Sequence, residues 1–169
     1  SRGGYPPVTV HGEGHIPGGS ATVRGDVSSQ FVSALLLVAP LAERNTEVRV
    51  TTPLESKPYV RLTMDAMRLP GVEATASQDM DCFKAPLGGY KPADVDVEGD
   101  WSSAAYLLAA GALGGDVAVN NLNPQSSQAD KAILGVLRDM GAELHLRSDG
   151  ARSVKSSLSA TSLDLSDCP

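Results

Sequence analysis

Two short polar strings have residue types and positions that could hold an anion. They are Ser28-Ser29-Gln30 and Ser56-Lys57-Pro58-Tyr59, and an apolar pattern with helical spacing follows each of them. The first amides of a helix have no partner within the helix and lie at the positive end of its dipole. Serine hydroxyls there add donors, so each string suits a phosphate or carboxylate group. Helix capping explains the same serines without a ligand, because serine is a favoured N-cap residue.

An internal repeat bears on this choice. Gly25-Asp26-Val27-Ser28-Ser29 recurs 74 residues later as Gly99-Asp100-Trp101-Ser102-Ser103. Several landmarks at nearly this offset indicate two copies of one structural unit of roughly 70 residues. On this alignment Gln30 corresponds to Ala104, so the second copy keeps the serines but has a methyl in place of the amide. A difference of this kind is what a site confined to the first copy would produce.

The elements that must position these strings follow the same order in both copies. The patterns predict first-copy strands at 8–11, 21–24, 46–51, 72–76 and 81–84, with helices after Ser28 and after Ser56. They predict second-copy strands at 94–97, 116–120, 143–147, 152–155 and 161–165, with helices at 102–113, capped by Ser102, and at 128–140. The fold class is therefore α/β, with two β-α-β-α-β-β units. If both helices of the first unit start at one edge of a parallel sheet, the two serine strings converge there.

Burial can also be predicted from these patterns. Phe31, Ala34, Leu35 and Val38 recur with helical spacing and are predicted to form the buried face of their helix. The glycine- and proline-rich stretch 86–92 is the predicted linker between the copies. The stretch 104–113 is apolar on every side, so something must pack around that helix.

Composition argues against several classes of protein. A net charge of −6 does not favour a nucleic-acid-binding surface, which needs clustered Lys and Arg. No apolar stretch approaches 18 residues, so no membrane span is expected. Cys82 and Cys168 have no metal-ligand spacing and are expected to be reduced thiols of a cytoplasmic protein. His11 and His15 are separated by glycines and do not predict a metal site.

The two serine strings, together with Gly99-Asp100-Trp101-Ser102-Ser103, resemble the 5-enolpyruvylshikimate-3-phosphate synthase family of enolpyruvyl transferases. The resemblance covers essentially the whole chain. It implies an inside-out α/β fold with three β-α-β-α-β-β units in each of two lobes. Residues 1–97 would be the last unit of the first-substrate lobe. Residues 98–169 would be the first unit of the other lobe, truncated at its C-terminus.

The resemblance also implies a reaction, that of a 3-phosphoshikimate 1-carboxyvinyltransferase. The enolpyruvyl group of phosphoenolpyruvate is transferred to the 5-hydroxyl of shikimate 3-phosphate without a metal or an organic cofactor. By motif, Ser28, Ser29 and Ser56 would bind the substrate phosphate. Gln30 would contact the shikimate ring and phosphoenolpyruvate, and Tyr59 would line the same site.

The family's lysine motif, its phosphoenolpyruvate-binding arginines and its later glutamate and lysine have no counterpart in this chain, and Asp167 is not assigned a catalytic role. We therefore expect a fragment that is inactive alone, with no catalytic residue of its own. Its partners would be missing segments of the enzyme or a second copy of the chain.

Two other interpretations stay open from the residues. The chain could be a non-catalytic α/β structural module whose serines only cap helices. It could instead be a fragment related to UDP-N-acetylglucosamine enolpyruvyl transferase or to a cyclase of the same fold. Gln30 and the Ser56 string disfavour this last interpretation.

Overall fold

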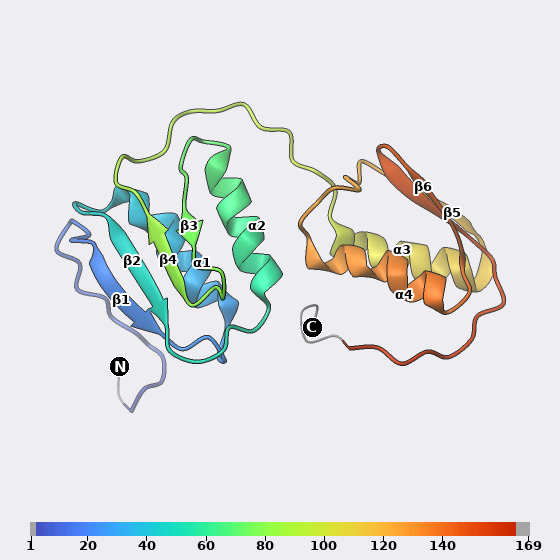
Figure 1. The fold of residues 1–169 in the computed structure, drawn as a ribbon, viewed down its shortest axis with the longest axis horizontal. Coiled ribbons are helices and arrows are strands. Elements are labelled where there is room, and N and C mark those ends of the chain that lie inside the picture. Colours follow the sequence, from blue (N-terminus) through green and yellow to red (C-terminus); the bar gives the residue numbers. More distant parts are fainter. Residues whose placement is uncertain (1–2, 165–169) are drawn as a thin grey trace.

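The computed structural model describes residues 3–164 and shows two α/β units joined by an extended connector (Figure 1). The elements of the first unit are β1 (Gly19–Val23), α1 (Ser29–Val38), the 3-10 turn η1 (Ala39–Leu41), β2 (Thr46–Val50), α2 (Lys57–Arg68), β3 (Thr75–Ala76) and β4 (Cys82–Ala85). Those of the second unit are α3 (Trp101–Gly114), β5 (Asp116–Asn120), the 3-10 turn η2 (Ala129–Ala132), α4 (Ile133–Asp139), β6 (Glu143–Arg147) and β7 (Gly150–Val154). The predicted α/β class is confirmed. Asp167, Cys168 and the end of the predicted strand 161–165 lie outside the described residues.

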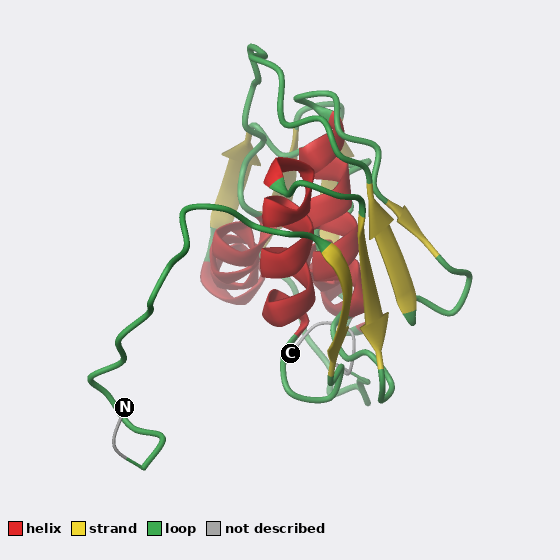
Figure 2. Cartoon of the chain, turned by 90° about the vertical axis from the view of Figure 1, so that its left-hand side faces the viewer, coloured by secondary structure: helices red, strands yellow, loops and turns green. Residues whose placement is uncertain are grey.

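The sheet of the first unit is mixed and has the strand order β1-β2-β4-β3. β1 and β2 are parallel, whereas β4 is antiparallel to both β2 and β3. Val48 pairs with Phe83, and both side chains are fully buried on the face that the helices cover (Figure 2). Arg49 and Lys84 project from the opposite, exposed face. Helices on one face and polar residues on the other give the strands their alternating pattern.

Helix α1 buries a different face from the predicted one. Val32 and Leu36 are fully buried, whereas the side chain of Phe31 is 53% exposed and Val38 is also exposed. The prediction was wrong because α1 is apolar on more than one side. Spacing alone does not identify the side that meets the sheet.

The second unit has the sheet order β5-β7-β6, with both pairs antiparallel. Its core contains Trp101, Leu108 and Leu122, all essentially inaccessible to solvent. The predicted helix 128–140 is divided into η2 and α4. Within the described residues this unit has the order α-β-α-β-β, because the predicted first strand 94–97 is absent and residues 161–164 form no strand.

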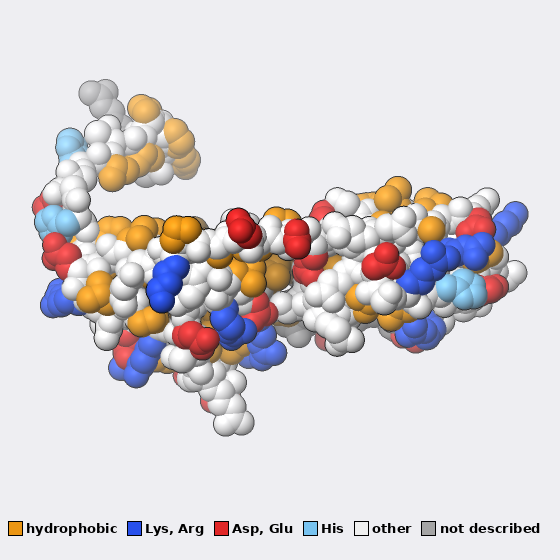
Figure 3. Space-filling view, turned by 90° about the horizontal axis from the view of Figure 1, so that it is seen from above, with side chains coloured by type: hydrophobic (Ala, Val, Ile, Leu, Met, Phe, Trp, Pro, Cys, Tyr) orange, Lys and Arg blue, Asp and Glu red, His pale blue; other side chains and the backbone are white. Residues whose placement is uncertain are grey.

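Two of the absent strands are exposed segments. Residues 3–18 form an irregular arm that projects from the first unit (Figures 2 and 3). Val10 is 85% exposed in this arm, and Val97 is 83% exposed in the connector. An alternating pattern describes a strand that has a pairing partner, and neither segment has one among residues 3–164.

The connector between the units begins later than predicted. Residues 86–91 are bound to the first unit, because Gly89 N donates to Pro40 O at 2.8 Å and Tyr90 Oη donates to Leu37 O at 2.7 Å. Lys91 N also donates to Pro70 O at 2.9 Å. The exposed connector is therefore 92–97, and the proline and glycine residues before it belong to a segment that is held on the first unit.

No helix within residues 3–164 combines the length and the apolar character that a bilayer-spanning helix needs.

Candidate functional site

A groove of about 760 Å³ lies between α1 and α2, and the N-terminal ends of both helices line it. The five residues that the sequence analysis assigned to substrate binding all line it, namely Ser28, Ser29, Gln30, Ser56 and Tyr59. The other lining residues are Val27, Ser33, Ala34, Leu37, Glu55, Leu62 and Thr63. The two serine strings therefore converge, as the parallel arrangement of β1 and β2 predicts, and their role in binding stays a prediction.

Either Ser28 or Ser29 was expected to cap the first helix, and in the structure Ser28 caps α1. Its backbone is extended, with φ −170°, and its Oγ accepts a hydrogen bond from Gln30 N at 3.2 Å. The cap fixes where the helix starts, which places Ser29 as the first helical residue, with 7% of its surface exposed. Gln30 follows at the exposed rim of the groove.

Ser56 occupies the N-cap position of α2, but its side chain makes no capping hydrogen bond. Its backbone is left-handed, with φ 53° and ψ 42°, which is uncommon for a residue other than glycine. The expectation of a serine side-chain cap was therefore wrong for Ser56. Such backbone conformations persist where the surrounding structure enforces them, and they are enriched at ligand sites. The Ser56 hydroxyl therefore makes no capping hydrogen bond to the helix that it precedes.

Two hydroxyl residues of the groove were not assigned to it by sequence analysis. Thr63 Oγ1 donates to Ser33 Oγ at 2.8 Å, which joins α1 to α2, and it also approaches Tyr59 O at 3.0 Å. Ser33 follows Ser29 by four residues, and Thr63 follows Tyr59 by four. Helical spacing from the two predicted positions is the signal that finds them.

The charge of the groove is unusual for an anion site. Glu55 is the one lining residue within residues 3–164 that carries a charged carboxylate or ammonium group, and the lining contains no Lys or Arg. Lys57 begins α2 and is half-buried, but it is not part of the lining. An anion in this groove would therefore be held by hydroxyls and helix amides.

The second unit contacts the groove through Tyr59. Tyr59 Oη donates to Asp130 Oδ2 at 3.1 Å, and Asp130 belongs to η2. Close by, Ser127 Oγ donates to Asp65 Oδ2 at 2.8 Å. These bonds place the start of η2 beside α2, as the ribbon also shows (Figure 1). The contact was not predictable from local patterns, because 71 residues separate its partners.

In the second unit, side chains fill the equivalent place. Trp101 begins α3 as Ser29 begins α1, and Gln128 precedes η2 as Ser56 precedes α2. Gln128 Oε1 accepts from Trp101 N at 2.8 Å, and the indole Nε1 donates to Asn123 O at 3.1 Å. A buried indole and a bridging amide thus occupy the space between the two helix starts.

The sequence alignment of the repeat is therefore wrong at these helix starts. Asp100, not Ser102, caps α3, and it accepts from Ser102 N at 3.0 Å and from Ser103 N at 3.1 Å. Three residues separate Gly25 from α1, but one residue separates Gly99 from α3. By helix start, Gln30 corresponds to Ser102 and not to Ala104. The first helical residue is Ser29 in the first unit and Trp101 in the second, and this difference accompanies the open groove in one unit and the filled space in the other.

Comparison with known proteins gives one consistent result. The family model for EPSP synthase (3-phosphoshikimate 1-carboxyvinyltransferase) matches residues 1–169. A 3-phosphoshikimate 1-carboxyvinyltransferase of Methanothermobacter thermautotrophicus is 43% identical over 168 residues, which cover 98% of this chain and 39% of the relative. That of Methanocorpusculum labreanum is 40% identical over 169 residues, which cover 100% of this chain and 39% of the relative.

A solved structure agrees on the fold. The EPSP synthase from Acinetobacter baumannii superimposes with a TM-score of 0.65 over 93% of this chain and 36% of that chain, at 22% identity. The present chain thus spans about two fifths of the length of these relatives, by the 39% that each match covers.

Proposed function

The chain belongs to the EPSP synthase family, and from that premise we propose that the groove between α1 and α2 binds the phosphate of shikimate 3-phosphate. The reaction that we propose for the whole enzyme is transfer of the enolpyruvyl group from phosphoenolpyruvate to the 5-hydroxyl of this substrate. One observation carries the proposal. Ser28, Ser29 and Ser56 line one groove, and the Ser56 hydroxyl is not used to cap its helix.

The roles follow from the chemistry of each side chain. The hydroxyls of Ser28, Ser29 and Ser56 donate to phosphate oxygens, together with the first backbone N–H group of each helix, from Ser29 and from Lys57. Later amides contribute less, because Gln30 N donates to Ser28 Oγ and Pro58 has no N–H. The Gln30 amide has both donors and an acceptor, so it binds a shikimate hydroxyl and reaches phosphoenolpyruvate. Tyr59 lines the opposite wall and contacts the ring.

This chain supplies substrate positioning and not proton transfer in our proposal. Among residues 3–164, Glu55 and Tyr59 are the lining residues with a titratable group. Addition and elimination need positioned acids and bases and stabilisation of charge. We assign those groups to segments of the enzyme outside these 169 residues. Residues 1–97 then belong to the lobe that binds shikimate 3-phosphate, and residues 98–169 begin the other lobe.

The test is a calorimetric titration of the chain with shikimate 3-phosphate, with shikimate as the control ligand. We expect saturable binding that requires the phosphate and is lost in the double variant Ser28→Ala/Ser29→Ala. Ser102→Ala/Ser103→Ala is the matched control, because it removes the same pair of hydroxyls from the second unit, and it should bind normally. A folded chain that binds neither ligand, or that binds both equally, would contradict the proposal.

We also propose that the isolated chain self-associates through its exposed apolar side chains (Figure 3). These lie on α1 and η1 and on α3, and they are Phe31, Leu37, Val38, Leu41, Tyr106, Leu107 and Leu113. Leu113 is 69% exposed and Tyr106 is 80% exposed, so the apolar helix α3 is covered on one side only. Large exposed apolar patches are uncommon on soluble monomers and often mark sites of protein–protein association.

Sedimentation equilibrium measures this association. We expect the average mass to exceed that of the monomer and to fall in Leu41→Lys/Leu113→Lys, which places charges on both faces. Lys84→Ala, on the polar face of the first sheet, is the control and should leave the mass unchanged. A monomeric wild-type chain at all concentrations would show that these faces do not attract one another.

A further inference from the structure

We propose that Thr52 and Asp26 are positioning residues, which hold the Ser28-Ser29 start of α1 against the Ser56 start of α2. The inference rests on the proposed function, because it concerns the groove to which that function is assigned. Neither residue lines the groove. Both lie in the loops that lead into it, and these are 24–28 before α1 and 51–56 before α2.

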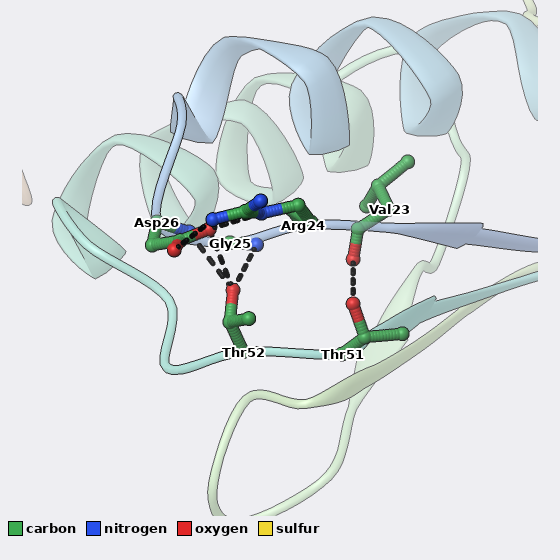
Figure 4. Close-up of polar contacts among 6 residues, drawn as sticks. All are labelled: Val23, Arg24, Gly25, Asp26, Thr51 and Thr52. Carbon is green, nitrogen blue, oxygen red and sulfur yellow. Dashed lines mark hydrogen bonds and ion pairs between the residues drawn. The ribbon is translucent and has the colours of Figure 1, made fainter.

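The Thr52 hydroxyl is the centre of the contact between the two loops (Figure 4). Its Oγ1 accepts from Gly25 N at 2.9 Å and from Asp26 N at 3.1 Å, and it donates to Asp26 Oδ1 at 2.9 Å. A hydroxyl has one proton to donate and two lone pairs to accept with. All three are used here, so this one side chain fixes the backbone and the side chain of the opposite loop.

Asp26 is held in place from its other side by Arg24. The guanidinium donates from Nε to Oδ1 at 2.9 Å and from its terminal nitrogen to Oδ2 at 2.6 Å, a bidentate pairing (Figure 4). The Arg24 hydrogen bond, followed by that from Thr52, holds the pKa of the Asp26 carboxyl well below its usual range. Asp26 is therefore an ionised acceptor for the Thr52 hydroxyl over the ordinary pH range.

Gly25 lets the loops approach closely enough for these bonds. A Cβ at this position would lie 2.6 Å from Val50 Cγ1 and 2.8 Å from Leu54 Cα, too close for any side chain. Gly25 O also accepts from Glu55 N at 3.2 Å. The chain then reaches Ser28 three residues after Gly25, and it reaches Ser56 four residues after Thr52. Little chain separates the contact from the serines, so the contact sets where both serines lie.

The second unit closes its loops in another way. Gly99 N donates to Asn121 O at 2.6 Å, a bond between backbone groups, and Gln128 joins the two helix starts directly. The Gln128 side chain thus lies in the place that corresponds to the groove of the first unit. The Thr52 contact joins the loops from outside the groove, so it leaves the space between the serines open to a ligand.

Thr52→Val tests this proposal, because valine keeps the shape of threonine and removes the hydroxyl. Thr51→Val is the matched control. Thr51 precedes Thr52 in the same loop, and its hydroxyl donates to Val23 O at 3.3 Å without contacting the loop before α1. Thr52→Ser restores the hydroxyl and should restore the wild-type behaviour. Far-UV circular dichroism checks that each variant is folded.

The first readout needs no ligand. We expect exchange of the hydrogen-bonded amides of Gln30, Phe31, Glu55 and Tyr59 to rise roughly tenfold in Thr52→Val and to stay unchanged in Thr51→Val. The hydrogen bonds that restrain the two loops are lost only in the former variant. Equal exchange in the two valine variants would overturn the positioning role, because a general loss of stability would affect both alike.

The second readout is the dissociation constant for shikimate 3-phosphate, measured on folded protein. We expect it to rise about tenfold in Thr52→Val only, because displaced serines bind the phosphate less well. Wild-type binding that Thr52→Val leaves unchanged would overturn the inference. If the wild type binds no ligand but the amides respond as stated, the proposed function fails and the positioning role stands.

Discussion

Single residues in this chain show how similar serines differ in their structural role. Ser28 caps α1 through its side chain, whereas Ser56 precedes α2 without doing so. Ser28→Ala should therefore lower the free energy of unfolding by about 1 kcal/mol, and Ser56→Ala should change it by less than about 0.5 kcal/mol. Urea denaturation measures both values. Equal losses would mean that Ser56 also stabilises its helix.

Asp100 gives a prediction about pH. Hydrogen bonds from the Ser103 hydroxyl and from the backbone amides of Ser102 and Ser103 lower the pKa of its carboxyl below the ordinary 3.8. The folded state therefore binds fewer protons than the unfolded state near that pH. This contribution to stability is complete above about pH 4 and is lost as the pH falls through the folded-state pKa.

Asp100→Asn isolates this contribution, because asparagine also caps helices but does not titrate there. We expect the variant to lose less stability than the wild type between about pH 5 and pH 2. Denaturant titrations at a series of pH values measure the difference. Parallel stability profiles for the two proteins would show that the Asp100 charge does not contribute.

The serine strings were predictable because capping and anion binding are local properties of a helix start. Thr52 and Asp130 were not predicted, because their contacts join residues 26 and 71 positions apart. Local patterns do not contain such contacts. The left-handed backbone of Ser56 is likewise imposed by the fold, since serine has no intrinsic preference for it.

At the scale of elements, two helical glycines should respond in opposite directions to the same change. A Cβ on Gly111 of α3 would lie 2.9 Å from Ser153 O on β7, whereas one on Gly135 of α4 would meet nothing within 4 Å. Gly135→Ala should stabilise the protein by roughly 0.5–1 kcal/mol. Gly111→Ala should destabilise it, because α3 must move away from the sheet. Thermal unfolding distinguishes the two, and stabilisation by both would contradict the close packing of α3.

Helices and strands were predicted well where the spacing of apolar residues alone was enough to locate them. The order of strands and helices in the first unit follows the apolar spacing, and α2 begins and β2 ends close to the predicted residues. The predicted strands 8–11 and 94–97 failed because an alternating sequence does not supply a pairing strand. The prediction of the buried side of α1 was wrong because two sides of this helix are apolar. In both cases a neighbouring element decides the structure, because it either pairs with the strand or covers one side of the helix.

For the whole molecule, hydrogen bonds from Tyr59 to Asp130 and from Ser127 to Asp65 join the two units. Each contributes about 1 kcal/mol, so Tyr59→Phe/Ser127→Ala should let the units separate. Small-angle X-ray scattering should then show a larger radius of gyration. Tyr106→Phe/Ser102→Ala makes the same chemical changes on α3 and is the control. An unchanged radius in the double variant would mean that other contacts hold the units together.

The repeat predicted that two units exist, but it did not predict how they lie relative to one another. Each unit has its own apolar core, which is why the spacing of apolar residues reveals it. The placement of the units depends on the exposed connector 92–97 and on a few polar contacts. No periodic pattern encodes contacts of that kind.

The different spacing between glycine and helix in the two units has a consequence for evolution and for design. If the units arose by tandem duplication, a two-residue difference in one loop shifted the helix start, so that Ser29 begins the helix in one copy and Trp101 in the other. The number of residues between the glycine and the helix would then distinguish a copy that binds a ligand from a copy that does not. An engineer seeking a second pocket would lengthen the loop after Gly99 before altering Trp101 or Gln128.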